Sequence, residues 1–313
     1  MTKCIESIDQ NHSADGTTKV LWRLTDGHTV ESVILPRALK QRKKLGSWHQ
    51  SSEAQVDQAG ERYTACISSQ VGCAMACDFC LTGKQGFLRH LTRDEIIAQV
   101  VELQKIKPVT NLVFMGMGEP LQNPVNVISA IEYFLSPQGL KLSRRKITVS
   151  TSGVVTAFEA LAKTGVRLAI SLNATTDELR SQIMPVNRKH PIAELIAASK
   201  RYAETVRQTV MIEYILLHGL NDSKEDADRL LALAQGWDCK VNLIPYNPFD
   251  GTPYLRPTPD TVKAFQHSLV SRGVTATVRY SGGDDILAAC GQLKSLNAQR
   301  KRGFVLEASP VGE

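Results

Sequence analysis

The sequence predicts an α/β fold built around a parallel sheet, and three observations support this prediction. Short apolar runs with strand character alternate with amphipathic helical patterns from Thr64 to Tyr280. A chain of 313 residues can bury a large core without disulfides. A hydrophobic content of 42% and a charged content of 22% are typical of a soluble globular protein. Repeated β-then-α units over this length are compatible with an open doubly wound sheet or with a barrel.

The N-terminal segment is predicted to form strands. The stretch "KVLWRLTDGHTVESVILP" alternates apolar and polar residues on both sides of Asp26-Gly27, which is a favoured two-residue hairpin turn. The residues from Arg37 to about Arg62 are polar, basic and without clear periodicity, so we expect a loop or a short helix there. We therefore divide the chain into an N-terminal extension, a core and a basic tail, at residues 1–62, 63–297 and 298–313.

The core is predicted to alternate seven strands with five longer helices. The strands are expected at Thr64–Ser68, Leu112–Met115, Ile147–Ser150, Leu168–Leu172, Val210–Leu216, Val241–Pro245 and Ala276–Tyr280. The helices are expected at Arg93–Lys107, Pro124–Leu135, Ile192–Tyr202, Lys224–Gln235 and Asp260–Ser271. Asp94, Glu95 and Asp260 lie early in their helices, where carboxylates suit the positive end of the helix dipole.

Polar or glycine-rich segments follow six of the seven predicted strands. They are "CAMACDFC", "GMGEP", "STSG", "SLNA", "PYNP" and "SGGDD…AAC". Because the strands are predicted to be parallel, all six segments should lie at one edge of the sheet. That edge holds the active site in barrels and in open α/β sheets alike. We therefore expect an enzyme.

The N-terminus and the hydropathy pattern predict a cytoplasmic protein that is not bound to a membrane. "MTKCIESIDQNHSADG" lacks the apolar core of a secretory signal, and no apolar run approaches the roughly 20 residues needed to cross a bilayer. In a reducing compartment, clustered cysteines favour metal binding or catalysis over structural disulfides.

The formal net charge of +6 is distributed unevenly along the chain. The basic runs are Arg37–Lys44, Lys141–Lys146, Arg188–His190 and Arg300–Arg302. Such runs permit contact with the phosphates of a nucleic acid. A solvated charged face is the alternative for each of them, so charge alone does not predict an RNA partner.

Three of the seven cysteines, Cys73, Cys77 and Cys80, have the spacing C-x3-C-x2-C. Three thiolates do not complete a tetrahedral metal site, but they can bind three irons of a [4Fe-4S] cluster and leave the fourth iron open. Zinc is the alternative, with Cys66 as a fourth ligand. Three unliganded cysteines would be unusual at this spacing.

This spacing, with Phe79 before the last cysteine, resembles the signature of radical S-adenosylmethionine (SAM) enzymes. "CISSQVGCAMACDFC", "FMGMGEPLQN", "STSGVV", "AISLNA", "NLIPYNPF" and "GDDILAACGQL" resemble the RlmN/Cfr family of radical SAM RNA adenine methyltransferases. The resemblance runs from about Lys19 to Leu293. It implies a radical SAM partial (β/α)6-type barrel with an N-terminal β-hairpin extension, a [4Fe-4S] cluster and two SAM molecules per turnover.

The resemblance also implies the substrate and the partners. The substrate would be an adenine carbon in ribosomal RNA, transfer RNA or both. Pro120 in "GMGEP" favours carbon 2, as in RlmN, and carbon 8 is the alternative. We expect a monomer that receives electrons from an external one-electron reductant, such as a flavodoxin-type system.

The resemblance assigns most of the polar segments to SAM binding. Gly118 and Glu119 match the family's pair beside the SAM amino group, where a carboxylate can pair with an ammonium. The other matched SAM contacts are Ser150, Ser171, Leu172, Asn173 and Asn247. Taken singly, such polar residues are more often hydrogen-bonded strand ends.

Two further cysteines and one carboxylate are implied to be catalytic. In the family, one SAM methylates a cysteine, and a second SAM is cleaved to the 5′-deoxyadenosyl radical that removes hydrogen from that methyl. Cys290 matches the methyl-carrying cysteine, and Cys66 matches the thiol that resolves the protein–RNA crosslink by a transient disulfide with Cys290. Glu31 matches the proton acceptor. Without the resemblance, Cys290 would be interpreted as a buried thiol in a helix and Glu31 as an exposed strand residue.

The sequence departs from the family pattern in four places. Members that act on large-subunit ribosomal RNA carry an N-terminal accessory helical domain, which we expect to be missing or much shortened here. The stretch between Glu31 and Cys66 is longer and more basic than usual. Asn173 replaces the usual His, and the Arg usual before "GDD" is absent from "YSGGDD". Two alternatives therefore stay open: a family offshoot with a different substrate, and a non-catalytic iron–sulfur or zinc RNA-binding protein.

Overall fold

The computed structural model describes residues 4–37 and 62–294, and these contain two sheets. Three strands precede the first gap: β1 (Ile5–His12), β2 (Thr18–Leu24) and β3 (Thr29–Arg37). The core strands are β4 (Arg62–Cys66), β7 (Val109–Phe114), β8 (Ile147–Thr151), β9 (Arg167–Ser171), β10 (Val210–Leu216), β11 (Cys239–Pro245) and β12 (Ala276–Val278). A separate antiparallel pair consists of β5 (Gln70–Gly72) and β6 (Phe87–His90).

The helices alternate with the core strands along the chain. They are α1 (Leu81–Lys84), α2 (Arg93–Ile106), α3 (Pro124–Leu135), α4 (Phe158–Ala162), α5 (Asp177–Ile183), α6 (Ile192–Val206), α7 (Lys224–Ala234) and α8 (Pro259–Val270). Short 3-10 turns lie between them, and the last is η6 (Asp284–Ile286). The predicted carboxylates Asp94, Glu95 and Asp260 do lie in first turns, and Glu95 completes a capping box with Thr92.

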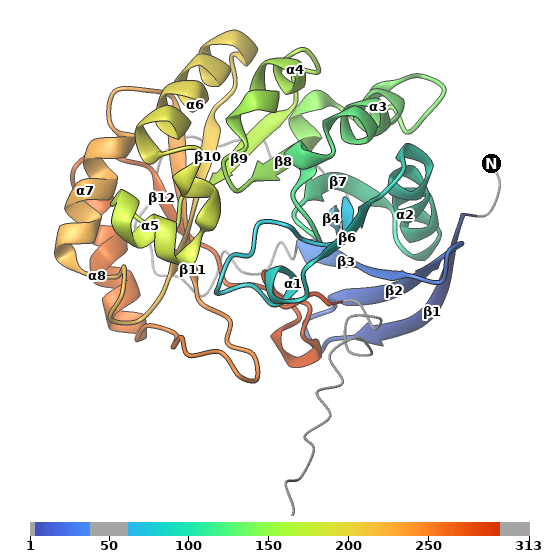
Figure 1. Ribbon diagram of the computed structural model, residues 1–313, viewed down its shortest axis with the longest axis horizontal. Coiled ribbons are helices and arrows are strands. Elements are labelled where there is room, and N and C mark those ends of the chain that lie inside the picture. The colour runs from blue at the N-terminus through green and yellow to red at the C-terminus, as the bar shows by residue number, and fades with distance from the viewer. Residues whose placement is uncertain (1–3, 38–61, 295–313) are drawn as a thin grey trace, which may run out of the picture.

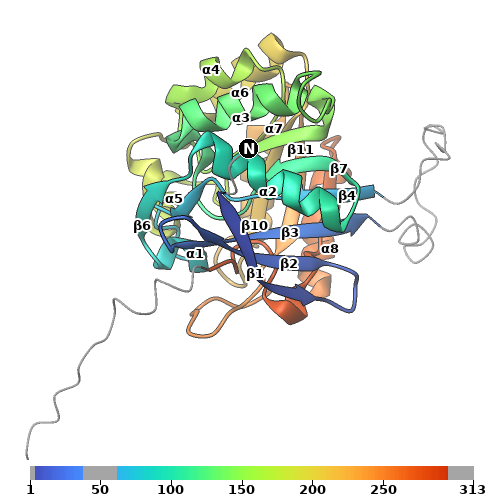
Figure 2. The same ribbon diagram turned by 90° about the vertical axis from the view of Figure 1, so that its right-hand side faces the viewer.

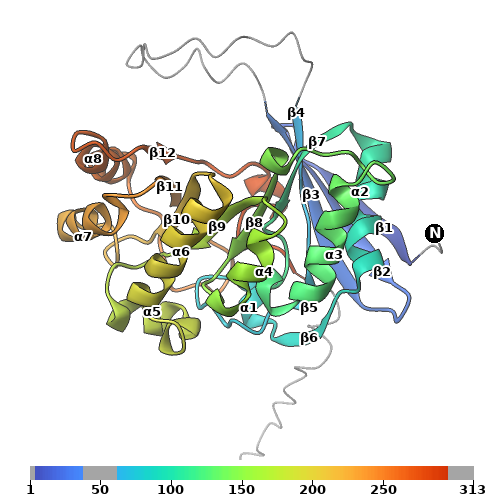
Figure 3. The same ribbon diagram turned by 90° about the horizontal axis from the view of Figure 1, so that it is seen from above.

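One ten-stranded sheet has the order β1-β2-β3-β4-β7-β8-β9-β10-β11-β12. From β4 to β12 every neighbouring pair is parallel, and a helix follows each strand before the next begins. Most of these helices lie along the outside of the curved sheet (Figures 1 and 3). Six such units followed by β12 confirm the predicted partial (β/α)6-type barrel.

The N-terminal strands continue this sheet instead of forming a separate layer (Figure 2). β2 and β3 are antiparallel and joined at Asp26-Gly27, where Gly27 has φ +82°, so the predicted hairpin is confirmed. β3 then pairs antiparallel with β4, the first strand of the barrel. This pairing places residues of β3 beside the end of β4, which carries Cys66.

The core strands were predictable because their side chains are apolar and inaccessible. Leu112, Val149, Ile170 and Ile212 are each 0% exposed, as expected of parallel strands covered on both faces. All seven predicted strands are present, with ends that differ by a few residues. Prediction missed β1 as a separate strand, the β5–β6 pair and the short helices α1, α4 and α5, because these elements are too short or too polar to show periodicity.

Two predicted segments cannot be compared with the structure. The loop or short helix expected between Arg37 and Arg62 and the basic tail at 298–313 lie outside the described residues. The division of the chain into three parts therefore stays a prediction. Within the part of the chain that the structure describes, no helix has the length and apolar character needed to span a membrane.

Candidate active site

A pocket lies at the C-terminal ends of the parallel strands. Five of the six polar segments named above contribute to it: the cysteine motif, "GMGEP", "STSG", "SLNA" and the segment that ends in "AAC". The predicted residues that line this pocket are Cys73, Cys77, Cys80, Gly118, Glu119, Ser150, Ser171, Asn173 and Cys290. The "PYNP" segment does not reach it. Chain topology thus brings together residues more than two hundred positions apart.

The three-cysteine motif lies in the loop between β5 and α1, and its backbone is tightly folded. Ala76 adopts φ +51°, and the amide of Cys80 donates to the carbonyl of Cys77 at 3.1 Å. A Cβ on Gly83 would lie 2.9 Å from the Cys77 carbonyl oxygen, so only glycine lets α1 approach the loop this closely. Phe79 is buried in a small apolar cluster beneath the loop. The aromatic residue of the motif therefore anchors the loop while the thiols line the pocket.

The donor set of this loop fits a [4Fe-4S] cluster. Burial raises the pKa of Cys73 to about 12 and raises the pKa of Cys77 and of Cys80 as well, so a cationic metal centre is needed to hold them as thiolates. Among the described residues, no three His, Cys, Asp or Glu side chains are grouped so that they could hold a single metal ion. A four-iron cluster does not require this, because each thiolate binds a different iron. Cys66 does not line this pocket, which weighs against the four-cysteine zinc site.

Glu119 provides a fixed carboxylate in the pocket. It is 2% exposed, and its Oε2 accepts hydrogen bonds from the amide and the hydroxyl of Ser152, both at 2.7 Å. Oε1 accepts from the amide of Leu121 at 2.9 Å. Burial raises the pKa of Glu119, and the hydrogen bonds from Ser152 oppose that effect. Gly118 has φ +95°, and a Cβ there would lie 2.5 Å from the side chain of Gln70, so glycine is required before this carboxylate.

Two of the predicted SAM contacts do not line the pocket. Leu172 is fully buried, and its carbonyl accepts a hydrogen bond from Nε of Arg180 at 2.9 Å. Asn247 donates to the Ser281 hydroxyl at 2.9 Å and accepts from Arg256 at 2.8 Å. Neither side chain lines the pocket.

Asn173, at the position where the family usually has His, does line the pocket, but its side chain is already engaged. Its Oδ1 accepts from the amide of Ile215 at 2.9 Å, and its Nδ2 contacts Sδ of Met184 at 3.3 Å. The residue has φ +57°, a left-handed conformation that asparagine tolerates better than most residues. Asn173 therefore shapes the wall of the pocket at the end of β9.

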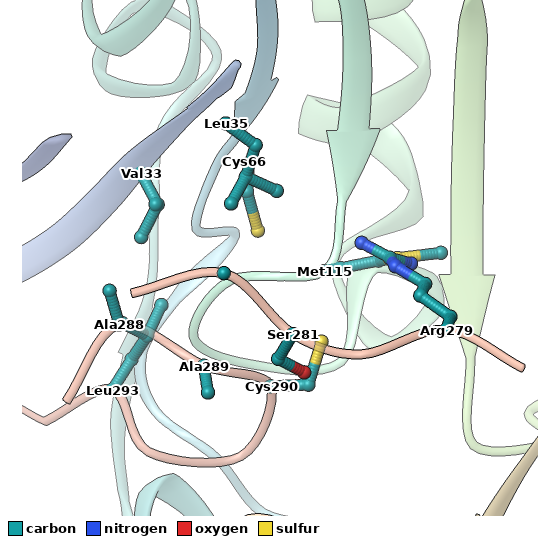
Figure 4. Close-up of a pocket in the computed structure, with 11 residues that line it drawn as sticks. Val33, Leu35, Cys66, Met115, Arg279, Ser281, Ala288, Ala289, Cys290 and Leu293 are labelled. Carbon is teal, nitrogen blue, oxygen red and sulfur yellow. The ribbon is translucent and has the colours of Figure 1, made fainter. Parts of the chain in front are cut away.

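A smaller cavity adjoins the pocket and contains the two remaining predicted catalytic cysteines (Figure 4). Cys66 ends β4, and Cys290 lies in a turn after η6, so the interpretation of Cys290 as a helical residue is wrong. Both are free thiols. Burial raises the pKa of Cys66 to about 12, and the neighbouring Cys290 adds to this effect. Cys290 also lines the larger pocket, so it stands between that pocket and Cys66.

Glu31 is not the exposed strand residue that the sequence alone suggests. It is 5% exposed, its Oε1 lies 3.3 Å from Nζ of Lys19, and its Oε2 accepts from the amide of Lys294 at 2.9 Å. Burial raises the pKa of Glu31, and Lys19 opposes that effect. On β3 it shares a face with Val33 and Leu35, which line the smaller cavity. Glu31 therefore lies beside this cavity, where it links Lys19 on β2 to Lys294 in the C-terminal segment.

The connection between β1 and β2, together with Lys19 on β2, holds the segment that carries Cys290. The amide of Gly283 donates to Oδ2 of Asp15 at 2.9 Å, and Nζ of Lys19 donates to the carbonyl of Leu287 at 3.3 Å. A Cβ on Gly282 would lie 2.7 Å from the Thr17 hydroxyl and 2.8 Å from Asp15. This crowding gives a physical reason for glycine in "YSGGDD", where the family usually has Arg.

Replacing Asp15 with alanine is expected to loosen this segment and to lower the free energy of unfolding by about 1 kcal/mol, since two amides lose a charged acceptor near the surface. Burial alone would raise the pKa of Asp15, but hydrogen bonds from Thr17 and Gly283 together hold it below its usual value. Its stabilisation is therefore present above the unfolded-state pKa of about 3.9 and is lost as the pH falls through the lower folded-state pKa.

Urea unfolding at pH 7 and at pH 3 measures this effect, with Asp9→Ala on the neighbouring strand as the control. The difference between wild type and Asp15→Ala should shrink at pH 3. A difference that is the same at both pH values, or amide exchange in residues 283–289 that is no faster than in wild type, would contradict the assignment.

Several residues of the site were missed by sequence reasoning. Arg180 is 0% exposed, and its guanidinium donates to the carbonyls of Ser152 and Ser171. Arg279 lines both cavities, and Glu213 lines the larger pocket. Arg180 lies in the polar helix α5, whereas Glu213 and Arg279 are single polar residues in or beside apolar strands. The position of Glu213 and Arg279 at or just after parallel strands was the one available signal.

Comparison with known proteins agrees with this geometry. Residues 67–231, just over half of the chain, match the family model of the radical SAM superfamily. The dual-specificity RNA methyltransferase RlmN of Geotalea uraniireducens (strain Rf4) is 48% identical over 283 residues, which cover 90% of this chain and 76% of the relative. RlmN of Geobacter sulfurreducens is 47% identical over 293 residues, which cover 93% of this chain and 75% of that relative.

A solved structure is similar over most of the chain. The crystal structure of a radical SAM methyltransferase from Sphaerobacter thermophilus has 40% sequence identity and a TM-score of 0.82, covering 93% of this chain and 81% of that chain. The cysteine loop lies within residues 67–231, the part of the chain that the radical SAM family model matches. The chain therefore belongs to the radical SAM superfamily and, within it, to the RlmN/Cfr family.

Proposed function

We propose that this protein methylates carbon 2 of an adenine in RNA through an S-methylated Cys290. One observation carries the proposal: Cys290 lies between the pocket that contains the three-cysteine loop and the cavity that contains Cys66. A thiol that first receives a methyl group and later forms a disulfide needs access both to the pocket and to a second thiol, here Cys66. The relatives named as dual-specificity RNA methyltransferases support an RNA substrate.

Membership of the radical SAM superfamily implies a [4Fe-4S] cluster and SAM. We assign Cys73, Cys77 and Cys80 to the cluster, and Gly118, Glu119, Ser150, Ser171 and Asn173 to the SAM pocket that they line. When bound, the cluster and SAM supply a methyl group for Cys290 and, from a second SAM, a radical. The Glu119 carboxylate, fixed by Ser152, offers a partner for an ammonium group. Leu172 contributes through its backbone, and Asn247 through the hydrogen bond that holds Ser281.

The proposed roles of Cys66 and Glu31 follow from their surroundings. Cys66 resolves the covalent adduct when its thiolate attacks the sulfur of Cys290. The Cys66–Cys290 disulfide forms, the bond from the Cys290 sulfur to the transferred carbon breaks, and that carbon keeps the electron pair and takes up a proton to become the methyl group of the base. Glu31 accepts the proton that the base must lose. The pKa of the Glu31 carboxyl is raised toward neutral pH, which suits a general base. Lys19 and the Lys294 amide keep its carboxylate oriented.

The exposed basic residues differ in how close they lie to the pocket, and therefore in whether they can contact RNA bound there. The run Lys141–Lys146 precedes β8 and therefore lies at the edge opposite the pocket. Arg188 and Lys189 are exposed and follow Met184, which lines the pocket. We propose that Arg188 and Lys189 contact phosphates beside the target base. We further propose that the protein acts as a cytoplasmic monomer and receives electrons from a flavodoxin-type reductant.

Nucleoside mass spectrometry tests the proposed function. Ribosomal and transfer RNA are digested from cells with and without the gene, and purified, cluster-loaded protein is then added to RNA from the deletion cells. We expect 2-methyladenosine to be lost on deletion and to be restored by the protein in at least one RNA pool. Restoration of 8-methyladenosine would instead support the carbon-8 alternative. If neither nucleoside changes, the RNA methyltransferase assignment is wrong, and an offshoot with another substrate becomes the better hypothesis.

A further inference from the structure

Arg279 occupies a distinctive position between the two cavities. It follows β12, its backbone amide donates to the carbonyl of Leu243 at 2.8 Å, and its side chain lines both the pocket and the smaller cavity. In Figure 4 the guanidinium extends toward the space beside the thiols of Cys66 and Cys290. Within the described residues, its side chain has one contact within hydrogen-bonding distance, a weak one from the guanidinium to Sδ of Met115 at 3.8 Å. Among the described residues, Arg279 therefore has no close carboxylate to neutralise it.

One acidic side chain, Glu213, interacts electrostatically with Arg279 without forming an ion pair with it among the described residues. Glu213 is 5% exposed, and its Oε1 accepts from Asn242 at 3.1 Å, whereas its Oε2 is buried without a hydrogen-bond partner. Burial raises the pKa of Glu213, and Arg279 opposes that effect. The pKa of Arg279 is raised above its ordinary value, chiefly by Cys290 and also by Glu213 and Cys66. Arg279 therefore remains a cation, and the two thiols are its principal electrostatic neighbours together with Glu213.

We propose that Arg279 is a positioning residue that keeps Cys290 and Cys66 reactive by stabilising their thiolate forms. This inference rests on the proposed function, because it explains how the buried thiol of Cys66 and the neighbouring thiol of Cys290 can act as nucleophiles. The thiolate, not the thiol, attacks carbon and sulfur, and a nearby cation favours it. Arg279 is the group that most strongly opposes the effect of burial on Cys66.

The chemical step affected is methylation of Cys290. The thiol loses its proton to solvent, and the sulfur lone pair forms a bond to the methyl carbon of SAM. The bond from that methyl to the sulfonium sulfur breaks, and its electron pair remains on the sulfur of the departing S-adenosylhomocysteine. No oxidant or reductant is needed. The guanidinium of Arg279 stabilises the anion from which this displacement starts, and later the Cys66 anion that attacks the Cys290 sulfur.

Thiol alkylation without RNA tests the inference separately from turnover. Cluster-loaded wild type, Arg279→Met and Arg279→Lys are treated anaerobically with iodoacetamide at pH 8, and the alkylation rates of the Cys66 and Cys290 peptides are followed by mass spectrometry. We expect Arg279→Met to slow at least one of the two thiols about tenfold, which corresponds to about one pKa unit. Arg279→Lys keeps a charge and should slow it less than about threefold. Arg272→Met, which removes an arginine paired with Asp228 on the surface, is the matched control.

Glu213→Gln is expected to change the alkylation rate in the opposite direction. It also keeps the inference testable if Arg279→Met does not fold. Removing the Glu213 charge leaves Arg279 with only the thiols as anionic neighbours, so alkylation should become faster. Unchanged alkylation rates in Arg279→Met and in Glu213→Gln would overturn the inference.

Two further outcomes distinguish thiol activation by Arg279 from phosphate binding by Arg279 and from a failure of the proposed function. If Arg279→Met weakens RNA binding and leaves alkylation unchanged, Arg279 binds a phosphate and the inference is wrong. If Cys290→Ala still methylates RNA, the proposed function fails, whatever the alkylation rates are. The alkylation assay therefore reports on Arg279, and the Cys290 variant reports on the function.

Discussion

Replacing Cys290 with alanine is expected to abolish methyl transfer, with turnover at least about a thousandfold below wild type. The alanine variant has no thiol to accept a methyl group, and among the described residues no other thiol or hydroxyl lines both the pocket and the cavity of Cys66. Cys290→Ser should be equally inactive, because a serine hydroxyl is ionised far less than a thiol near neutral pH. Methylated nucleosides formed by purified, cluster-loaded protein on RNA lacking the modification give the measurement.

Cys66→Ala provides the companion result. It retains the methyl-carrying sulfur but lacks the resolving thiol, so we expect it to accumulate a covalent protein–RNA adduct that migrates slowly on a denaturing gel. Cys239→Ala is the control, since Cys239 is half-buried at the start of β11, its thiol donates to the carbonyl of Ala234, and it lines neither the pocket nor the smaller cavity. Turnover of Cys290→Ala above about a tenth of the wild-type rate would rule out the S-methyl intermediate.

Much of the fold was predictable from local patterns. Residues 210–216 were assigned to a strand with both ends correct, and residues 124–135 to a helix with both ends correct. In both cases burial and periodicity extend over the whole element, and Pro124 marks the helix start. The β5–β6 pair escaped prediction because its register is set by the cysteine loop and by contacts with other strands, not by its own alternation.

The residues of the candidate site also fall into two groups: those that local sequence predicts and those that only the tertiary structure brings together. Cys73, Cys77 and Cys80 are close in sequence, so their spacing alone indicates a metal centre. Cys66 and Cys290 come together only because the C-terminal segment and the end of β4 line one cavity, and resemblance to a family was needed to associate them.

Glu31, Glu213 and Arg279 show the limit of reading a sequence one position at a time. Each is a polar residue in or beside an apolar strand, where solvent exposure is the usual expectation. Glu31 is nevertheless buried because the C-terminal segment crosses β3 and donates the Lys294 amide to it. That crossing depends on the tertiary structure, and no local pattern in β3 predicts it.

The second large effect concerns the cluster. Replacing Cys77 with alanine is expected to reduce bound iron from about four atoms per chain to less than one and to eliminate methyl transfer. The loop around Cys77 is held by Phe79 and by the close approach of Gly83, so no neighbouring side chain can move into its place without disturbing α1. Iron analysis and the visible absorption of the anaerobically purified protein measure the loss.

The decisive comparison is with Cys66→Ala, because it separates a three-thiolate cluster from a four-cysteine zinc site. Cys66 lies in the smaller cavity beside Cys290, not in the pocket of the three-cysteine loop, so its removal should leave iron content and absorption unchanged. If Cys66→Ala loses metal as Cys77→Ala does, or if the native protein binds zinc in place of iron, the assignment of Cys66 to catalysis is wrong. Retention of the cluster in Cys66→Ala together with its loss in Cys77→Ala would instead show that neighbouring cysteines in one sequence segment have separate chemical roles, set by the turn of the chain after β4.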